Sequence, residues 1–432
     1  MSAVHARIPL ISAPSRMPAS RDFPPRILGT RAVKHASRYT VRRMADLRNG
    51  VSTLLPLSHL SSHDLLRMLP FRSRRKESEA PPRCCTVTNH CSTARGLNGE
   101  RMAETEFVFP VASSTWSERH ARGEVPGLWP YGLERIDRPG RPVAMRHVSA
   151  PSRGARLAWR LRPRAARNER LGLAWDEGTA HAMAASRRYG RMHCGVIWAT
   201  DRLDQADGRA TAGVRRTLSA MQSVWVLSRG QLDAVDRLVG SSTPSEFVKF
   251  GVDDAFFSPA PYPEQPLLFS AGGDRDRDHE TILAAFAQVV RARPHVKAVV
   301  QTRARASAPG VTVVPHLSHL ELREFYRRSS VVAIATRPNL HVSGMTVSLE
   351  AQATGRPVIL THTPGAEDYV DDGVTGFLMS SQATDRWVER LIDLVDDPAR
   401  AASMGHEARR HVEDEFTCQH LANRLATAVG LA

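Results

Sequence analysis

The stretch from residue 343 to residue 360, SGMTVSLEAQATGRPVIL, predicts a loop, a short helix and a buried strand in succession. Ser343 and Gly344 suit the helix entrance, where free backbone N–H groups and the helix dipole attract phosphate oxygens and glycine permits close approach. Thr346 and Glu350 are four residues apart, so they share one helix face. A carboxylate there could accept hydrogen bonds from both ribose hydroxyls. The stretch therefore predicts a nucleotide site.

Glycine and proline delimit this helix and strand. Gly355 suits the end of the helix, and Pro357 precedes the apolar strand Val-Ile-Leu. Residues 363–365, Thr-Pro-Gly, break the chain again at the carboxyl end of the strand. Ligands of open α/β sheets bind at that edge, so the nucleotide site belongs there.

Three blocks in one order, residues 344–358, 364–370 and 372–378, resemble the donor-binding half of a known family. This is the large retaining GT-B glycosyltransferase family that includes glycogen and sucrose synthase-like enzymes (glycosyltransferase group 1, family 4). The resemblance implies two Rossmann-like domains facing across a cleft. It also implies transfer of a sugar, with retention of anomeric configuration, from a nucleoside diphosphate sugar to an acceptor.

The family carries a pair of glutamates separated by seven residues, of which the second holds the ribose. Glu350 matches the second glutamate, whereas the first falls on Val342. Other atoms must then contact the transferred sugar, such as the backbone around Ser343 and Gly344 or the ring of His341. The resemblance assigns donor binding to Ser343, Gly344, Met345, Thr346 and Glu350.

Arg277 is the main candidate for neutralising the leaving diphosphate. It follows the apolar run and glycine pair of residues 267–273, at the place where the family has a lysine or arginine that pairs with the diphosphate. The alternative is a surface ion pair with Asp274 or Asp278. The catalytic candidates are therefore Arg277 and Glu350, with Gly272 and Gly273 added on the donor side. The sequence carries no metal motif, so we expect no metal and no cofactor beyond the nucleotide sugar as co-substrate.

The acceptor side is less specific. Asp201 ends the strand candidate at residues 195–200, and His181 lies in a helical stretch; both could face the cleft, as could Asp176 and Glu177. Strand ends and helix starts attract such residues for local reasons as well, so both interpretations stay open. A glycan, a lipid or a small molecule could each be the acceptor.

Charge is concentrated in the N-terminal part of the chain. Of 59 Lys+Arg and 44 Asp+Glu in 432 residues, residues 1–101 hold 18 and 6, which leaves 41 and 38 for the remainder. The enzyme-like part is therefore close to neutral, and we expect no nucleic-acid partner. Peripheral contact with an anionic membrane stays open. The chain has no apolar run of membrane-spanning length and only 5 cysteines, which fits a reducing cytoplasm.

Residues 1–101 are poor in aromatics and sustained periodicity, which predicts a disordered extension. Three explanations compete: a basic tail that touches nucleic acid or anionic lipid, an Arg- and Ser-rich targeting peptide, or translation from upstream of the true start codon. We favour the third, because charge, cysteine content and pattern all change near Met102.

Beyond this part, strand candidates alternate with helical stretches, which predicts an α/β protein with mostly parallel, doubly wound sheets. We expect an N-terminal acceptor domain over residues 102–259 and a proline-stiffened linker over 260–266. The donor-binding domain follows over 267–415. The resemblance implies that the last helix, 416–432, crosses back to the first domain.

Two other function classes compete with the transferase. A sugar-nucleotide epimerase shares the architecture, but the sequence blocks fit transferases better. A non-catalytic nucleotide-sugar-binding protein is suggested by Val342 alone.

Overall fold

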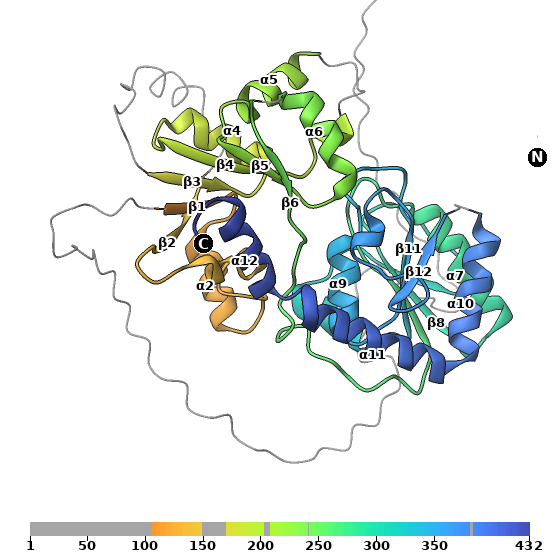
Figure 1. Cartoon of the computed structure of the whole chain (residues 1–432). Coiled ribbons are helices and arrows are strands. Elements are labelled where there is room, and N and C mark those ends of the chain that lie inside the picture. The colour runs from red at the N-terminus through yellow and green to blue at the C-terminus, as the bar shows by residue number, and fades with distance from the viewer. Residues whose placement is uncertain (1–104, 149–169, 203–207, 241, 381–382) are drawn as a thin grey trace, which may run out of the picture. The chain divides into compact units, whose positions relative to one another are not determined.

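The computed structural model describes residues 105–148, 170–202, 208–240, 242–380 and 383–432 (Figure 1). The expectations for residues 1–101 lie outside these ranges. The described part forms two α/β domains, each built on a six-stranded parallel sheet. The expected fold class is therefore confirmed.

The first domain has the strand order β2-β1-β3-β4-β5-β6. Its strands are β1 (Thr105–Phe109), β2 (Val143–His147), β3 (Leu171–Ala174), β4 (Arg191–Val196), β5 (Ser223–Val226) and β6 (Ser245–Phe247). Buried apolar side chains join one sheet face to the helices α4 (Glu177–Ser186), α5 (Gly208–Leu218) and α6 (Leu232–Val239). Strands β2 and β3 pair with opposite edges of β1, so the strand order reverses between β1 and β3.

The second domain has the order β12-β11-β10-β7-β8-β9. Its strands are β7 (Leu267–Ser270), β8 (Lys297–Gln301), β9 (Val311–Val314), β10 (Val331–Ile334), β11 (Val358–Thr361) and β12 (Gly376–Met379). The helices α7 (His279–Ala292) and α10 (Thr384–Asp396) share one buried cluster with the sheet. The helices α8 (His319–Arg328), α9 (Met345–Ala353) and α11 (Pro398–Glu415) contribute to another. The order reverses between β7 and β10, the place where doubly wound sheets bind ligands.

The strand expected at residues 195–200 lies earlier, as β4 over Arg191–Val196. The backbone N–H groups of Ile197 and Trp198 donate to the carboxylate of Glu177, at 3.0 and 2.9 Å, instead of continuing the sheet ladder. The chain therefore turns away from the sheet at Ile197, and Trp198 remains 38% exposed.

The last helix, α12 (Cys418–Ala428), packs against the first domain (Figure 1). Its contact is the 3-10 helix η2 (Pro130–Ile136), and Arg138 just beyond η2 donates to Asn423 Oδ1 at 2.8 Å. The C-terminal helix thus fixes the position of the segment that contains η2 in the first domain.

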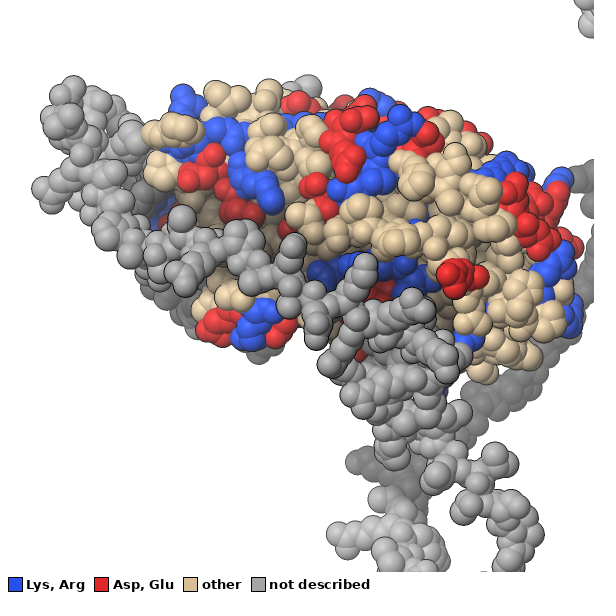
Figure 2. All heavy atoms as spheres, turned by 90° about the horizontal axis from the view of Figure 1, so that it is seen from below, with Lys and Arg blue, Asp and Glu red and all other residues tan. Residues whose placement is uncertain are grey.

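Lysine and arginine intermingle with aspartate and glutamate on the face that Figure 2 shows. Cys194 and Cys418 are buried free thiols. Within the described ranges, no helix combines the length and the apolar content that crossing a bilayer requires.

Candidate functional site

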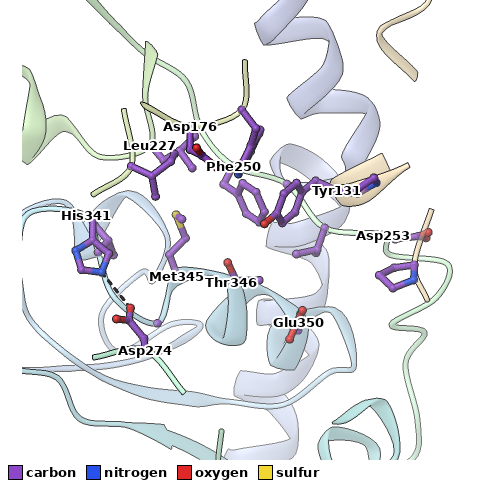
Figure 3. Close-up of a pocket in the computed structure, with 18 of the residues that line it drawn as sticks. Tyr131, Asp176, Leu227, Phe250, Asp253, Asp274, His341, Met345, Thr346 and Glu350 are labelled. Carbon is purple, nitrogen blue, oxygen red and sulfur yellow. Dashed lines mark hydrogen bonds and ion pairs between the residues drawn. The ribbon is translucent and has the colours of Figure 1, made fainter. Parts of the chain in front are cut away.

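A cavity of about 550 Å³ lies where both sheets reverse their strand order (Figure 3). The segments after β1 and β3 supply one wall, including Pro110, Trp175 and Asp176. The segments after β7 and β10 supply the other, including Gly273 and Glu350. All four segments follow the carboxyl ends of strands at the reversal points, so parallel-sheet topology brings them together.

Arg277 is buried in the second-domain wall, with 6% of its surface exposed. Its Nε and Nη1 have no hydrogen-bond partner among the described residues. The carboxylate of Asp278 instead accepts from the backbone and hydroxyl of Thr281, at 3.2 and 2.7 Å, and that of Asp274 binds Ser343. Arg277 is therefore not in the surface ion pair with Asp274 or Asp278 that the sequence left open as the alternative. Burial deprives the Arg277 guanidinium of water and lowers its pKa. An anion in the cavity would therefore bind strongly to this guanidinium.

Two glycines make room for the Arg277 guanidinium. Gly272 and Gly344 have left-handed backbones, with φ of 127° and 103°. A Cβ at Gly344 would lie 2.5 Å from Arg277 Nη1, and a Cβ at Gly272 would meet Arg277 Nε more closely still. The glycines that the sequence assigned to the donor side thus hold the arginine between them, while Gly273 lines the cavity.

Glu350 faces the cavity from the second turn of α9 and is 8% exposed. Its Oε2 accepts a hydrogen bond from the hydroxyl of Tyr326, at 2.8 Å. Burial raises the pKa of Glu350 to about 7, although the hydrogen bond from Tyr326 and the charge of Arg277 act to lower it. The carboxyl group therefore changes charge near neutral pH.

The entrance of α9 also lines the cavity, through Ser343, Gly344, Met345 and Thr346. Ser343 N–H donates to Asn339 Oδ1 at 2.8 Å, and Met345 N–H donates to the carbonyl of Val342 at 3.0 Å. These two bonds fix the turn, and the helix dipole then points its positive end at the cavity.

A buried imidazole links the two domains beside this entrance. His341 Nδ1 lies 2.6 Å from Asp201 Oδ2 of the first domain, and Nε2 lies 3.0 Å from Asp274 Oδ2 of the second. Burial alone would lower the pKa of His341, but both carboxylates raise it to about 9. Burial would likewise raise the pKa of Asp274, yet hydrogen bonds from His341, the Asp276 backbone and Ser343 hold it well below its usual range. A protonated His341 therefore bridges the domains.

Replacing His341 by alanine is expected to lower the free energy of unfolding by about 3–5 kcal/mol near neutral pH, because two half-buried carboxylates lose their buried cationic partner. The folded-state pKa of about 9 exceeds the ordinary value of 6.5. The stabilisation is therefore complete below about pH 6.5 and is lost as the pH rises through about 9. Denaturant unfolding at several pH values should show the wild type and the variant drawing closer over that window.

The matched control is His362→Ala. The ring of His362 meets Glu367 at the surface, 3.4 Å apart, and exposed pairs contribute under about 1 kcal/mol. If the wild type exceeded the His341 variant in free energy of unfolding by the same amount below and above this pH window, the protonated bridge would be contradicted.

Val342, at the position of the family's first glutamate, is buried in the cavity wall with a left-handed backbone, φ 49°. The nearby His341 ring has both nitrogens engaged by carboxylates. Besides Glu350, this wall has the carboxylate of Asp274, which lies in the segment after β7.

The acceptor-side candidates divide. Asp201 lies at the edge of the cleft, where it binds His341 and accepts from Leu340 N–H at 2.6 Å. The structure does not bring His181 to the cavity: it is exposed on α4, with Nδ1 3.1 Å from Thr217 Oγ1 of α5. His181 lies instead where α4 meets α5, apart from the residues that line the cavity.

Asp176 lines the cavity but caps α4 by accepting from Thr179 N–H at 2.7 Å. Glu177 holds the turn after β4. Local structural roles therefore account for both carboxylates.

The sequence interpretation missed an aromatic wall on the first-domain side. It includes Trp116, Tyr131, Trp175, Trp198 and Phe250. These residues come from five separate segments, so no local spacing connects them. The available signal was their place just after strands β3, β4 and β6 and in the glycine- and proline-rich segment 126–132.

Among the described side chains, three have ligand atoms close enough to share a metal ion: Asp274, Asp276 and His341. A metal needs a neutral imidazole with a free nitrogen. In this arrangement Asp201 engages Nδ1 of His341 and Asp274 engages Nε2, so the imidazole presents no free nitrogen to a metal.

Residues 253–411 match the family model described as "Glycosyl transferases group 1". A D-inositol 3-phosphate glycosyltransferase of Rhodococcus opacus is 37% identical over 125 residues, which are 29% of this chain and 27% of that protein. A GDP-mannose-dependent monoacylated alpha-(1-6)-phosphatidylinositol monomannoside mannosyltransferase of Corynebacterium glutamicum is 29% identical over 214 residues, 43% of this chain and 56% of that protein. The chain thus spans between a quarter and just over half of these relatives' lengths.

Solved structures resemble a larger part of the chain. Sucrose-phosphate synthase from Thermosynechococcus elongatus matches with a TM-score of 0.56 and 15% identity, covering 76% of this chain and 98% of that one. Anabaena Alr3699/HepE in complex with UDP and glucose matches with a TM-score of 0.57 and 12% identity, covering 77% and 100%. At these identities the likeness establishes the fold. The chain therefore has a GT-B fold, and its residues 253–411 are similar to the group 1 glycosyl transferases.

Proposed function

We propose that this protein is a glycosyltransferase that moves a sugar from a nucleoside diphosphate sugar to an acceptor hydroxyl. The observation that carries the proposal is the buried Arg277, whose Nε and Nη1 lie beside the entrance of α9 and have no hydrogen-bond partner in the described part of the chain. A buried guanidinium without a hydrogen-bonded carboxylate is costly unless an anion completes the site. The matched family and the nucleotide named in a solved neighbour's title support the same class of ligand.

The side chains divide the donor between them. Arg277 and the positive end of α9 neutralise the diphosphate, whose charge grows as the sugar leaves. Glu350, one turn further along α9, accepts hydrogen bonds from the ribose when it is ionised. Asp274 lies where a carboxylate can contact the transferred sugar in place of the glutamate replaced by Val342.

Retention of configuration and independence of metal are part of the proposal. Retention is supported by the resemblance of the blocks from Gly344 to Leu378 to a retaining family. Metal independence is supported by Arg277, which already supplies a cation, and by the engaged His341. Proton NMR of the first product formed would report the anomeric configuration, and a chelator should leave turnover unchanged.

The acceptor enters against the first-domain wall. The names of the two relatives indicate inositol-containing acceptors for those proteins. For this chain a glycan, a lipid or a small molecule is proposed, with peripheral membrane contact if the acceptor is a lipid. A cytoplasmic location stays a prediction from the cysteine content.

A thermal-shift panel of UDP, GDP, ADP and their sugars tests donor binding. One nucleotide family should raise the melting temperature, because a ligand at 100 times its Kd stabilises the fold by about 2.7 kcal/mol. Slow hydrolysis of the matching nucleotide sugar, with a chelator present, should follow. No shift with any of these ligands would contradict the function.

Binding without any turnover would favour the non-catalytic alternative. Epimerised sugar released without an acceptor would favour the epimerase. The panel therefore separates the three function classes in one series.

A further inference from the structure

The first-domain wall presents a stack of aromatic rings to the cavity. Tyr131 stacks on Trp175 with ring centroids 4.3 Å apart and an interplanar angle of 24°. Phe250 meets Tyr131 edge-on at 5.4 Å and Trp175 at 6.0 Å. Figure 3 places Tyr131 and Phe250 across the cavity from Thr346 and Glu350 of α9. The stack therefore faces the proposed donor site.

Tyr131 is held in a disfavoured backbone conformation. Its φ is 62°, and a bulky side chain with a left-handed backbone is a genuine outlier. The described residues contain three such non-glycine positions, of which Tyr131 and Val342 line this cavity and Arg187 ends α4. Strain of this kind persists where the surroundings enforce it, and it clusters at ligand sites.

The segment around Tyr131 is fixed from several sides. Gly127 N–H donates to the carboxylate of Asp253 at 2.8 Å, and Gly127 carbonyl accepts from the Trp116 indole at 3.2 Å. A Cβ at Gly132 would lie 2.6 Å from Cys418, so α12 presses on the next residue. The ring of Tyr131 is thus preorganised, although the residue is 37% exposed.

The charge of this wall disfavours a phosphorylated acceptor. Among the described first-domain residues that line the cavity, the charged ones are Asp176 and Asp253, both acidic. Burial, together with the charges of Asp176 and Glu350, raises the pKa of Tyr131 to about 12, so its phenol stays protonated and neutral. The cations that line the cavity, Arg277 and the protonated His341, both lie in the second domain. A second phosphate would meet carboxylates here.

We propose that the Tyr131–Trp175–Phe250 stack is the acceptor platform and that it takes an uncharged acceptor with a flat apolar face, such as a neutral sugar ring or an aromatic aglycone. This inference rests on the proposed transferase function. It names a substrate class that differs from a phosphorylated acceptor, because stacking on a rigid aromatic ring rewards an apolar face and the neighbouring carboxylates repel phosphate.

The test uses the full chain saturated with the nucleoside diphosphate that stabilises it most. The probes are p-nitrophenyl glycosides as neutral acceptors and inositol phosphate as the charged one. Nitrophenyl binding is read as quenching of tryptophan fluorescence, since Trp175 and Trp198 line the cavity. Transfer of sugar to each probe is measured in parallel.

Two variants separate the ring from the backbone. Tyr131→Phe keeps the ring, whereas Tyr131→Leu keeps an apolar side chain under the same backbone constraint but removes the flat face. Leu128→Ala, at a 44% exposed residue in the same segment outside the cavity lining, is the control. Melting temperatures establish that each variant is folded.

The expected result is that neutral glycosides bind and accept sugar while inositol phosphate does not. Tyr131→Leu should weaken glycoside binding about 10- to 100-fold, with the melting-temperature shift by nucleotide unchanged. Tyr131→Phe and Leu128→Ala should stay within a few-fold of the wild type.

Two outcomes would overturn the acceptor platform while the function stands: transfer to inositol phosphate that is indifferent to Tyr131→Leu, or nucleotide binding with no neutral glycoside bound at millimolar concentration. Failure of every nucleotide to shift the melting temperature would overturn the proposed function itself, and the platform with it.

Discussion

Replacing Arg277 by alanine is expected to lower kcat/KM for the nucleotide sugar by about 10²–10³-fold. Removing one preorganised donor from developing negative charge costs about that much in kcat, and hydrogen bonds to charged groups contribute about 1.5–3 kcal/mol each. Arg277 has Nε and Nη1 buried and unpartnered, so the variant loses more than one such donor. Arg277→Lys keeps the charge but not the planar fork, and it should fall between wild type and alanine.

The same substitution should leave the unliganded protein as stable as before or more stable. A buried guanidinium that lacks a hydrogen-bonded carboxylate destabilises a fold, and its removal relieves that cost. Denaturant unfolding without nucleotide measures this directly. A large loss of stability on Arg277→Ala would mean that the arginine is structural and would contradict its role at the diphosphate.

Arg275→Ala is the matched control. Arg275 lies two residues before Arg277 but pairs with Asp276 at 3.1 Å, with 38% of its side chain exposed. Exposed pairs of this kind contribute about 0–1 kcal/mol, so stability and donor turnover should both stay near wild type. The contrast between two arginines in one loop isolates burial and orientation as the cause.

What the sequence could predict was local. The spacing of Thr346 and Glu350 on one helix, with glycines at its entrance, needs only the period of a helix. Arg277 follows a recognisable strand and glycine pair. The glycines at 272 and 344 were assigned to the ligand, and the structure adds that they also make room for Arg277. The contact with Gly344 joins residues that are 67 positions apart in the chain.

What the sequence could not predict depended on tertiary contacts. Tyr326, which donates to Glu350, lies 24 residues away on another helix, and His341 is 140 residues from Asp201. Strand β3 reads Leu-Gly-Leu-Ala, without the β-branched residues typical of strands, so it gave no signal. Because β3 was missed, Trp175 beyond it could not be placed at the switch point.

The titration of Glu350 gives the second large effect. Ribose hydroxyls donate to a carboxylate, so only the ionised form of Glu350 can accept from both. With a pKa raised by burial to about 7, Glu350 is mostly protonated one unit lower. Nucleotide affinity should therefore rise about tenfold between about pH 6 and pH 8, because the apparent affinity is proportional to the fraction of protein in which Glu350 is ionised. Calorimetric titration over that range measures it.

Three comparisons attribute this pH dependence to Glu350 and not to the ligand, whose phosphates also titrate. A nucleoside diphosphate without the 2′ and 3′ hydroxyls should bind with a much flatter profile, and so should the full nucleotide with Glu350→Gln. Tyr326→Phe removes the hydrogen bond that lowers the pKa of Glu350, so the midpoint should move to higher pH. Because loss of the carboxylate and loss of the hydroxyls should flatten the profile to the same degree, unequal slopes from these two changes would mean that Glu350 does not hold the ribose.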